Sequence, residues 1–399
     1  MIRKIPKLLC VCVCAALTMI STSSGVCASG GAEETLPAAK STAVSDEPPA
    51  VTARCCILTE MQTGTVLFAK NAEKQESLSH FAKLMTLLLL AERVGSGKLS
   101  LTDTFTVSAH ANSQGDPQIW LDRNEKISVD ELIKAITVGN ANDAAVTIAE
   151  GVSGNEEKFV KAMNDKASRL GMSKTLFRDP TGSDPEGVTT AADLSKLCAE
   201  VSKHAFLGSY LKTWLTTVRS GKTELLNSNR LVRTYSGITG MKAFGSQKYG
   251  SCACVTADKL GMKLCAVVIG CPDNDKRDSD VRKLLKYATD EFSLYTPKIP
   301  EEILENIPVT HGETGECELE AENTPPVVIR RGTAGELRAE SKREEMLEAP
   351  VEKGRICAVY SLYDDKKCVF TVNIVSANSV GKMNWQCAVK KLLYNLIKL

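Results

Sequence analysis

The segment from Leu84 to Arg93 constrains the fold more than any other, because it is apolar on almost every face of a helix. A helix without a polar face is stable only inside a larger domain, where other elements cover all of its sides. The chain has 399 residues, of which 43% are hydrophobic and 24% are charged, so it can bury such a helix. At roughly 100–200 residues per domain, this length predicts two domains with additional segments.

Strand and helix patterns surround this buried segment. Strands are predicted at Ala53 to Thr59, Thr65 to Ala69, Gly250 to Ala257 and Lys263 to Gly270. Further helices are predicted at Leu132 to Glu150, Glu156 to Leu170, Asp193 to Val201 and Arg282 to Tyr295. Beyond Pro297, residues 300–378 show short alternating segments with turns, which predict a small β-rich domain.

The N-terminus has the pattern of an export signal. Arg3, Lys4 and Lys7 precede an apolar run from Leu8 to Ile20, and small residues follow as far as Ala28. This pattern predicts a signal peptide over residues 1–28 that is cleaved after Ala28. The alternative is a retained N-terminal anchor. Residues 29–50 are rich in Ala, Ser, Thr, Glu and Pro, which predicts a flexible linker.

Cysteine content and net charge exclude several classes of protein. Four of the fifteen cysteines lie in the signal segment, and the eleven that remain leave at least one thiol without an intramolecular partner. No C-x-x-C pair occurs, so we expect neither a zinc site nor another metal or cofactor. Cys252 and Cys254 alternate on one predicted strand, and they are either small apolar core residues or members of disulfides. A formal net charge of +1 gives no sign of nucleic-acid binding.

The C-terminal segment, residues 379–399, predicts an amphipathic helix. Its apolar residues recur at helical spacing, and they are Trp385, Val389, Leu392, Leu393 and Leu396. Lysines supply charge to the same segment. Because basic amphipathic helices lie in membrane interfaces, we expect the membrane surface to be a partner of this helix. The alternative is a helix packed on the β-rich domain or on a partner chain.

Three short motifs mark the serine enzymes that recognise penicillin, namely Ser-x-x-Lys, Ser-x-Asn and Lys-Thr-Gly. A Ser and a Lys three residues apart share one face of a helix, so the amine can activate the hydroxyl. Short fragments that flank these motifs occur one after another along this chain. They are Gly64 to Phe68, Ala82 to Thr86, Gly139 to Ala145, Leu170 to Met172, Thr190 to Leu194, Asn227 to Leu231, Gly240 to Lys242 and Gly250 to Cys252.

This order and spacing closely resemble the low-molecular-weight penicillin-binding proteins of the D-alanyl-D-alanine carboxypeptidase family. The resemblance covers about residues 53–378 and includes Ala349 to Gly354 in the β-rich segment. It implies an α/β transpeptidase-like domain at residues 51–296, with a sheet flanked by helices and a helical subdomain, and a small all-β domain after it. It also implies a cell-wall location and removal of the terminal D-Ala from peptidoglycan stem peptides through an acyl-serine.

The chain departs from the family pattern in all three motifs. Counting from Gly64, the position of the catalytic serine holds His80, and the first motif keeps only Lys83. The second motif reads Asn140-Ala141-Asn142, so its serine is replaced, and the third reads Lys242-Ala243-Phe244. Without the serine hydroxyl the family's acyl-enzyme cannot form. The resemblance also implies that Ala243 removes a donor to the substrate carboxylate and that Phe244 narrows the substrate cleft.

Two functional classes therefore stay open. The first is a catalytically inactive protein that binds a peptidoglycan stem peptide or an envelope partner. In this class His80 has no catalytic role and lies in a former active site. The second is an active carboxypeptidase in which Ser79 serves as a displaced nucleophile, since residues four apart also share a helix face. A one-residue slip rotates a side chain by roughly 100° around a helix, which weighs against Ser79. A class A β-lactamase is disfavoured because the chain continues into the β-rich segment and lacks the first serine.

Overall fold

The computed structural model describes residues 48–397. The predicted signal peptide, residues 1–28, and almost all of the predicted linker, residues 29–50, lie outside the described residues. No helix among residues 48–397 is long and apolar enough to cross a bilayer.

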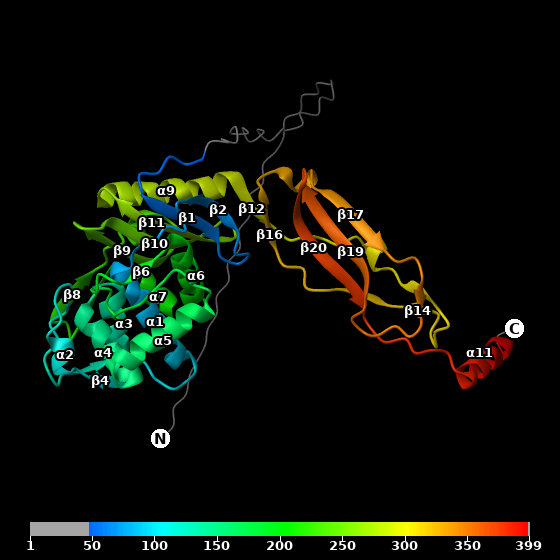
Figure 1. The fold of residues 1–399 in the computed structure, drawn as a ribbon, viewed down its shortest axis with the longest axis horizontal. Coiled ribbons are helices and arrows are strands. Elements are labelled where there is room, and N and C mark those ends of the chain that lie inside the picture. Colours follow the sequence, from blue (N-terminus) through cyan, green and yellow to red (C-terminus); the bar gives the residue numbers. More distant parts are fainter. Residues whose placement is uncertain (1–47, 398–399) are drawn as a thin grey trace, which may run out of the picture. The chain divides into compact units, whose positions relative to one another are not determined.

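A five-stranded antiparallel sheet forms the centre of the first part of the chain (Figure 1). Its strands are β1 (Cys55–Glu60), β2 (Val66–Lys70), β9 (Ile238–Ser246), β10 (Gly250–Lys259) and β11 (Met262–Cys271), in the order β2-β1-β11-β10-β9. Strand β1 pairs with β11, so that Leu58 lies opposite Ala266. Segments that are about 200 residues apart in sequence therefore form one sheet.

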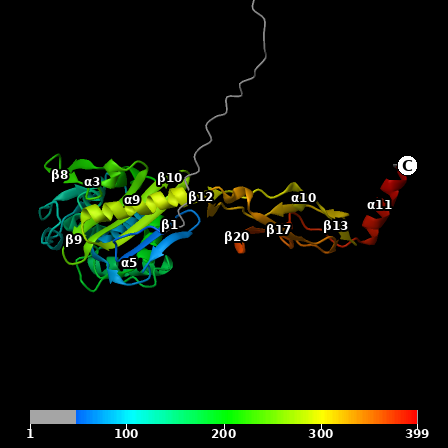
Figure 2. The same ribbon diagram turned by 90° about the horizontal axis from the view of Figure 1, so that it is seen from above.

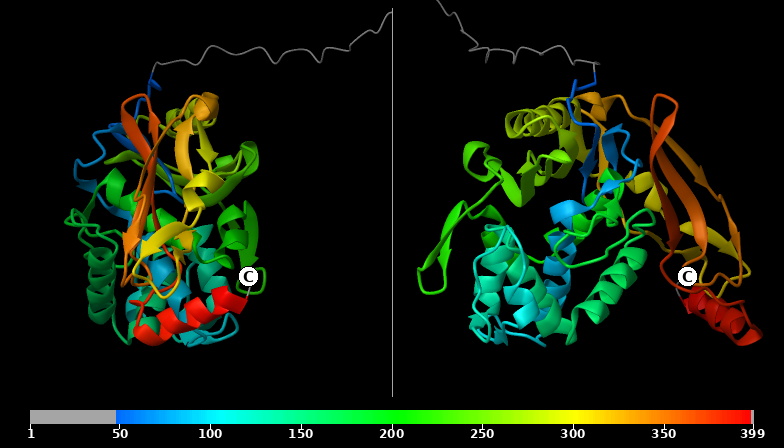
Figure 3. Two further views of the ribbon diagram at one scale, coloured as in Figure 1. Left: turned by 90° about the vertical axis from the view of Figure 1, so that its right-hand side faces the viewer. Right: turned by 60° about the vertical axis from the view of Figure 1, so that its left-hand side comes forward.

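Helices cover both faces of this sheet, as the views in Figures 2 and 3 show. On one face lies α9 (Asn274–Glu291), whose Val281, Leu284, Leu285 and Ala288 join an apolar cluster with the strands. The other face is covered by α1 (Ala82–Gly95), α6 (Ala191–Ser202) and the helical subdomain. The first ten residues of α1 are all buried, which confirms the expected buried helix.

The helical subdomain and its hairpins complete this part of the chain. Its helices are α2 (Ala109–Asn112), α3 (Val129–Thr137), α4 (Asn142–Ser153), α5 (Glu156–Arg169) and α7 (Leu207–Lys212). The short helix α8 (Leu231–Thr234) instead joins the apolar cluster on the α9 face through Leu231. The short strands pair as β3 (Glu76–Ser77) with β6 (Val188–Thr189), β4 (Thr104–Thr106) with β5 (Lys126–Ser128), and β7 (Leu215–Val218) with β8 (Thr223–Leu226). A 3₁₀ turn, η1 (Ser79–Phe81), leads directly into α1.

Two helix predictions were wrong in their bounds. The single helix predicted from Leu132 to Glu150 is two helices, α3 and α4, because Asn140 has a φ of +58° that no right-handed helix accommodates. The helix predicted from Arg282 to Tyr295 begins at Asn274, where the Asp273 side chain caps it, and ends at Glu291. The residues that follow form the strand β12 (Phe292–Tyr295), which pairs with β16 (Val327–Arg330).

The C-terminal part is β-rich, as predicted, and its strands form two further sheets. One sheet has the order β14-β13-β18, with β13 (Ile307–Thr310), β14 (Glu316–Cys317) and β18 (Leu347–Glu348). The other has the order β15-β20-β19-β17, with β15 (Leu319–Ala321), β17 (Arg338–Arg343), β19 (Ile356–Asp364) and β20 (Lys367–Ser376). Short helical turns occur at α10 (Glu301–Leu304) and η2 (Thr333–Gly335), and the last element is the helix α11 (Trp385–Ile397).

The cysteines of residues 48–397 are free thiols, and most of them are buried. Cys252 and Cys254 belong to the same apolar cluster between the sheet and α1. Burial raises the pKa of the Cys252 thiol to about 11, so it stays protonated and unreactive at neutral pH. The structure therefore supports the interpretation of these residues as small apolar core side chains rather than disulfide partners.

Candidate active site

The first motif lies where the turn η1 enters α1. Lys83 is 1% exposed, and its Nζ lies 3.1 Å from Nδ1 of His80 and donates a hydrogen bond of 2.8 Å to the carbonyl oxygen of Thr181. Lys83 Nζ thus contacts the side chain that the sequence analysis predicts at the position of the motif serine. The amine is held by these two acceptors, the imidazole and a backbone carbonyl.

Ser79 precedes His80 in the same turn, with a φ of +44° and only 6% exposure. Among the described residues no hydrogen bond joins Ser79 Oγ to Lys83 Nζ. The backbone of Ser79 is instead covered by Gly182, where an added Cβ would lie 1.6 Å from the Ser79 carbonyl oxygen. Any larger residue would clash here. Gly182 also has a φ of +80°, which glycine adopts without strain.

The loop that carries Thr181 and Gly182 was missed by the sequence analysis. The carboxylate of Asp179 accepts hydrogen bonds from the backbone N–H groups of Thr181, Gly182 and Asp184. Burial raises the pKa of Asp179, but a hydrogen bond from the Thr181 hydroxyl and these backbone bonds together lower it below its usual value. Thr86 of α1 donates a hydrogen bond of 2.8 Å to the carbonyl of Pro180. The turn residues Asp179-Pro180-Thr181-Gly182 were the available sequence signal for this loop.

The second motif lies at the break between α3 and α4. The Asn142 amide donates to the carbonyls of Gly115 and Asp116, at 2.9 and 3.1 Å, and this fixes its orientation. Its Oδ1 is buried without a hydrogen-bond partner among the described residues, and the same holds for Oδ1 of Asn140. Two acceptor oxygens therefore lack donors at this motif. The motif serine that the family resemblance implies is replaced by an amide in the left-handed conformation.

The third motif lies on the edge strand β9. Lys242 is 4% exposed and donates a hydrogen bond of 2.7 Å to the carbonyl of Ile136 in α3. The ring of Phe244 packs edge-to-face on both His80 and Phe81, with centroid distances of 5.1 and 4.8 Å. The side chain of Ala243 joins the apolar cluster beneath α9 on the other face of the sheet. Phe244 is the third-motif side chain that contacts the first motif.

Charge and burial oppose protonation throughout this region. Burial is the largest cause that lowers the pKa of Lys242, to about 7, and it also lowers the pKa of Lys83 well below its usual value. Burial, together with the two lysine charges, lowers the pKa of His80 to about 3, so the imidazole is neutral at pH 7. The charge of Lys242 lowers the pKa of Lys83, while the charge of Asp143 raises it. Groups from the first motif, β9 and α4 are thus close enough to interact.

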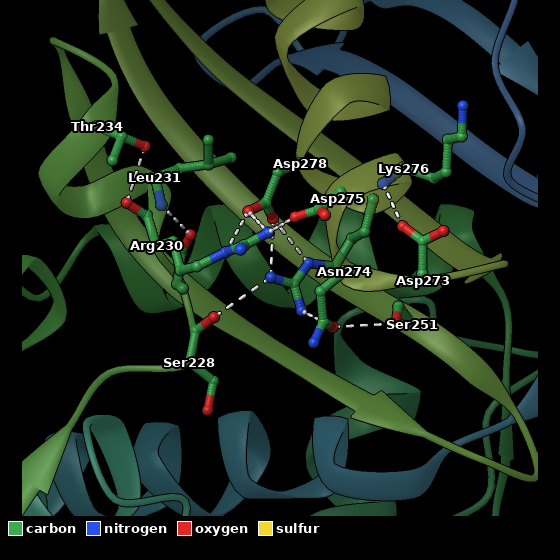
Figure 4. Close-up of polar contacts among 12 residues, drawn as sticks. Ser228, Arg230, Leu231, Thr234, Ser251, Asp273, Asn274, Asp275, Lys276 and Asp278 are labelled. Carbon is green, nitrogen blue, oxygen red and sulfur yellow. Dashed lines mark hydrogen bonds and ion pairs between the residues drawn. The ribbon is translucent and has the colours of Figure 1, made fainter.

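Hydrogen bonds and ion pairs join the segment around Asn227 to Leu231 to α9 (Figure 4). Arg277 is 1% exposed and binds the carboxylate of Asp278 through Nε and Nη2, at 2.9 and 2.8 Å. Its remaining donors reach Asn274 and the carbonyl of Ser228, and Arg230 binds the second oxygen of Asp278. Because each of the three guanidinium nitrogens donates to an acceptor, this buried cation has a structural role, in which it joins α9 to the segment before α8.

The antiparallel sheet, its two helical layers and the meeting of three motif positions beside α1 define a transpeptidase-like domain of the penicillin-binding protein kind. Residues 42–273 match the D-alanyl-D-alanine carboxypeptidase family, and residues 292–382 match the penicillin-binding protein 5 C-terminal domain. The chain belongs to the D-alanyl-D-alanine carboxypeptidase family, which acts in peptidoglycan metabolism.

Individual relatives agree with this assignment. The D-alanyl-D-alanine carboxypeptidase DacF of Bacillus subtilis is 30% identical over 348 residues, which cover 86% of this chain and 89% of that protein. The D-alanyl-D-alanine carboxypeptidase DacC of Escherichia coli is 29% identical over 319 residues, covering 78% and 80%. The structure of penicillin binding protein 5 from Haemophilus influenzae gives a TM-score of 0.76 at 26% identity, covering 84% of this chain and 99% of that one.

Proposed function

We propose that this chain is a non-acylating member of the family that is exported and binds peptidoglycan at the cell envelope. The observation that carries the proposal is the contact between His80 and Lys83, 3.1 Å apart, at the position of the catalytic serine. A neutral imidazole accepts the amine's hydrogen bond but offers no hydroxyl to acylate. The contact of Phe244 with both aromatic residues of the turn supports a narrowed cleft for the stem peptide.

We expect the purified protein to show no labelling by a fluorescent penicillin and no release of D-Ala from a pentapeptide above background. In serine hydrolases, loss of the nucleophile costs on the order of a million-fold in turnover. An active carboxypeptidase of the family, labelled in parallel, is the positive control. Strong labelling of the unmodified protein that disappears with Ser79→Ala would overturn the proposal and establish Ser79 as the displaced nucleophile.

We also propose that helix α11 binds the outer surface of the cytoplasmic membrane after export. Trp385, Val389 and Leu393 are 74%, 48% and 54% exposed, and their spacing of four residues puts them on one helix face. An exposed apolar stripe with an aromatic end and nearby lysines suits a membrane interface.

The membrane proposal predicts that a chain ending at Ser379 moves from the membrane fraction to the soluble fraction when cells are fractionated. A full-length variant with Trp385→Ser and Leu393→Ser should behave like the truncated chain, because it keeps the helix but loses the apolar stripe. If both altered chains stay with membranes as fully as the native protein, α11 is not the anchor.

A further inference from the structure

Trp120 is an exposed aromatic residue on a segment that is otherwise buried or polar. Its side chain is 64% exposed, whereas the neighbouring Ile119 and Leu121 are each 1% exposed. The residues that follow, Asp122 and Arg123, are exposed and charged. The indole is therefore a single apolar ring with hydrogen-bonding groups next to it, rather than part of a continuous apolar surface along this segment.

The backbone holds Trp120 in a conformation that bulky residues rarely adopt, with a φ of +54°. Two charged side chains clamp the segment on either side of the ring. The carboxylate of Asp143 accepts hydrogen bonds from the N–H groups of Ile119 and Leu121, and Arg219 donates to the carbonyls of Ile119 and Trp120, at 3.2 and 2.7 Å. Strained backbone of this kind persists only where its surroundings over-determine it.

Asp143 and Arg219, which we call the clamp, are themselves held in place and are connected to the second motif. Arg219 has a side chain only 14% exposed and forms ion pairs with Glu125 and Asp122, at 2.7 and 2.8 Å. Asp143 directly follows Asn142, whose amide holds the same loop through the carbonyls of Gly115 and Asp116. The exposed ring is thus positioned relative to the candidate site by buried and charge-assisted hydrogen bonds.

We propose that Trp120 is a stacking platform for a sugar ring of the peptidoglycan glycan strand, so that the chain binds the polymer through its carbohydrate. The proposal rests on the proposed function, which places the chain at peptidoglycan. A pyranose presents an apolar C–H face that packs on an indole, and its hydroxyl and acetamido groups need polar partners at the rim. A rigid aromatic ring loses little conformational entropy on binding. A protein partner would require a larger continuous apolar patch than this one ring.

The test is co-sedimentation of the full chain with purified peptidoglycan sacculi, with the N-acetylglucosamine tetramer as a soluble competitor. Trp120→Ala should weaken binding by about tenfold, as expected for a truncated aromatic anchor, while Trp120→Phe keeps most of it. Leu260→Ala, at a 69% exposed apolar residue in the turn between β10 and β11, is the control and should bind like the native chain. The tetramer should displace the native chain, and it should quench fluorescence of the native protein but not of Trp120→Phe.

A second variant addresses the clamp. Arg219→Ala leaves the ring in place but releases the carbonyls of Ile119 and Trp120, so binding should fall while the chain stays folded by circular dichroism. Equal binding by the native chain and Trp120→Ala, absence of binding by the native chain, or displacement only by sugar-free stem peptide would each overturn the sugar platform. Absence of binding by the native chain would overturn the peptidoglycan-binding part of the proposed function as well, whereas equal binding by the native chain and Trp120→Ala would overturn this inference alone.

Discussion

We expect a variant with four restored motif residues to be acylated by a fluorescent penicillin, whereas the unmodified chain is not. The four substitutions are His80→Ser, Asn140→Ser, Ala243→Thr and Phe244→Gly. The scaffold around them keeps Lys83 buried beside the turn and Lys242 on β9. Removing the imidazole frees Lys83 Nζ from its contact at 3.1 Å, so that the amine can accept a proton from a serine hydroxyl.

The single and partial variants make this prediction specific. His80→Ser alone should restore little labelling, because Phe244 still packs on the turn and Asn140 still lacks a hydroxyl. Adding Phe244→Gly should give the largest further gain, since Ala243 lies in the cluster beneath α9 and Phe244 contacts the first motif. The measure is the rate of labelling at fixed penicillin concentration. If the variant with all four substitutions folds and remains unlabelled, the rest of the site no longer supports acylation and the prediction is wrong.

Replacing Lys242 with Met should raise the free energy of unfolding by about 2–4 kcal/mol at pH 6, because a buried ammonium is removed. Burial lowers the pKa of Lys242 to about 7 in the folded protein, from an ordinary value of 10.5. Between these two values the unfolded chain binds more protons than the folded chain, so the native protein becomes more stable as pH rises. Below pH 7 the Lys242 amine is charged in both the folded and the unfolded state, so the folded protein carries the full cost of burying an ammonium group.

The gain from Lys242→Met should therefore shrink as pH rises from 6 to 10. At pH 10 the substitution removes a mostly neutral amine and leaves the Ile136 carbonyl without its hydrogen bond of 2.7 Å, so the gain approaches zero or reverses. Urea unfolding at both pH values measures the difference, and Lys98→Met, at an exposed lysine, is the control. A stability difference that does not change with pH would contradict burial of a titrating amine at this position.

Local spacing was enough to predict much of the fold. The apolar run at Leu84 to Arg93 predicted a helix buried on every side, and the first ten residues of α1 are buried. Strand patterns near Ala53 and Gly250 predicted elements that pair in one sheet. The order of the motif surroundings indicated the family and the β-rich segment after it, and both are confirmed. These features depend on side-chain periodicity and on residues close together in sequence, which a linear chain displays directly.

The sequence alone also predicted that His80 stands at the position of the catalytic serine, since the spacing to Lys83 is local, and this stays a prediction. It could not show what the replacement residues do. That Lys242 donates to Ile136, 106 residues away, and that Phe244 packs on His80 depend on how α3, β9 and η1 come together. The hydrogen bond from Arg219 to the carbonyl of Trp120, 99 residues away, depends on a long-range contact as well. Periodicity reports which face of an element is apolar, but tertiary packing alone decides which distant groups meet.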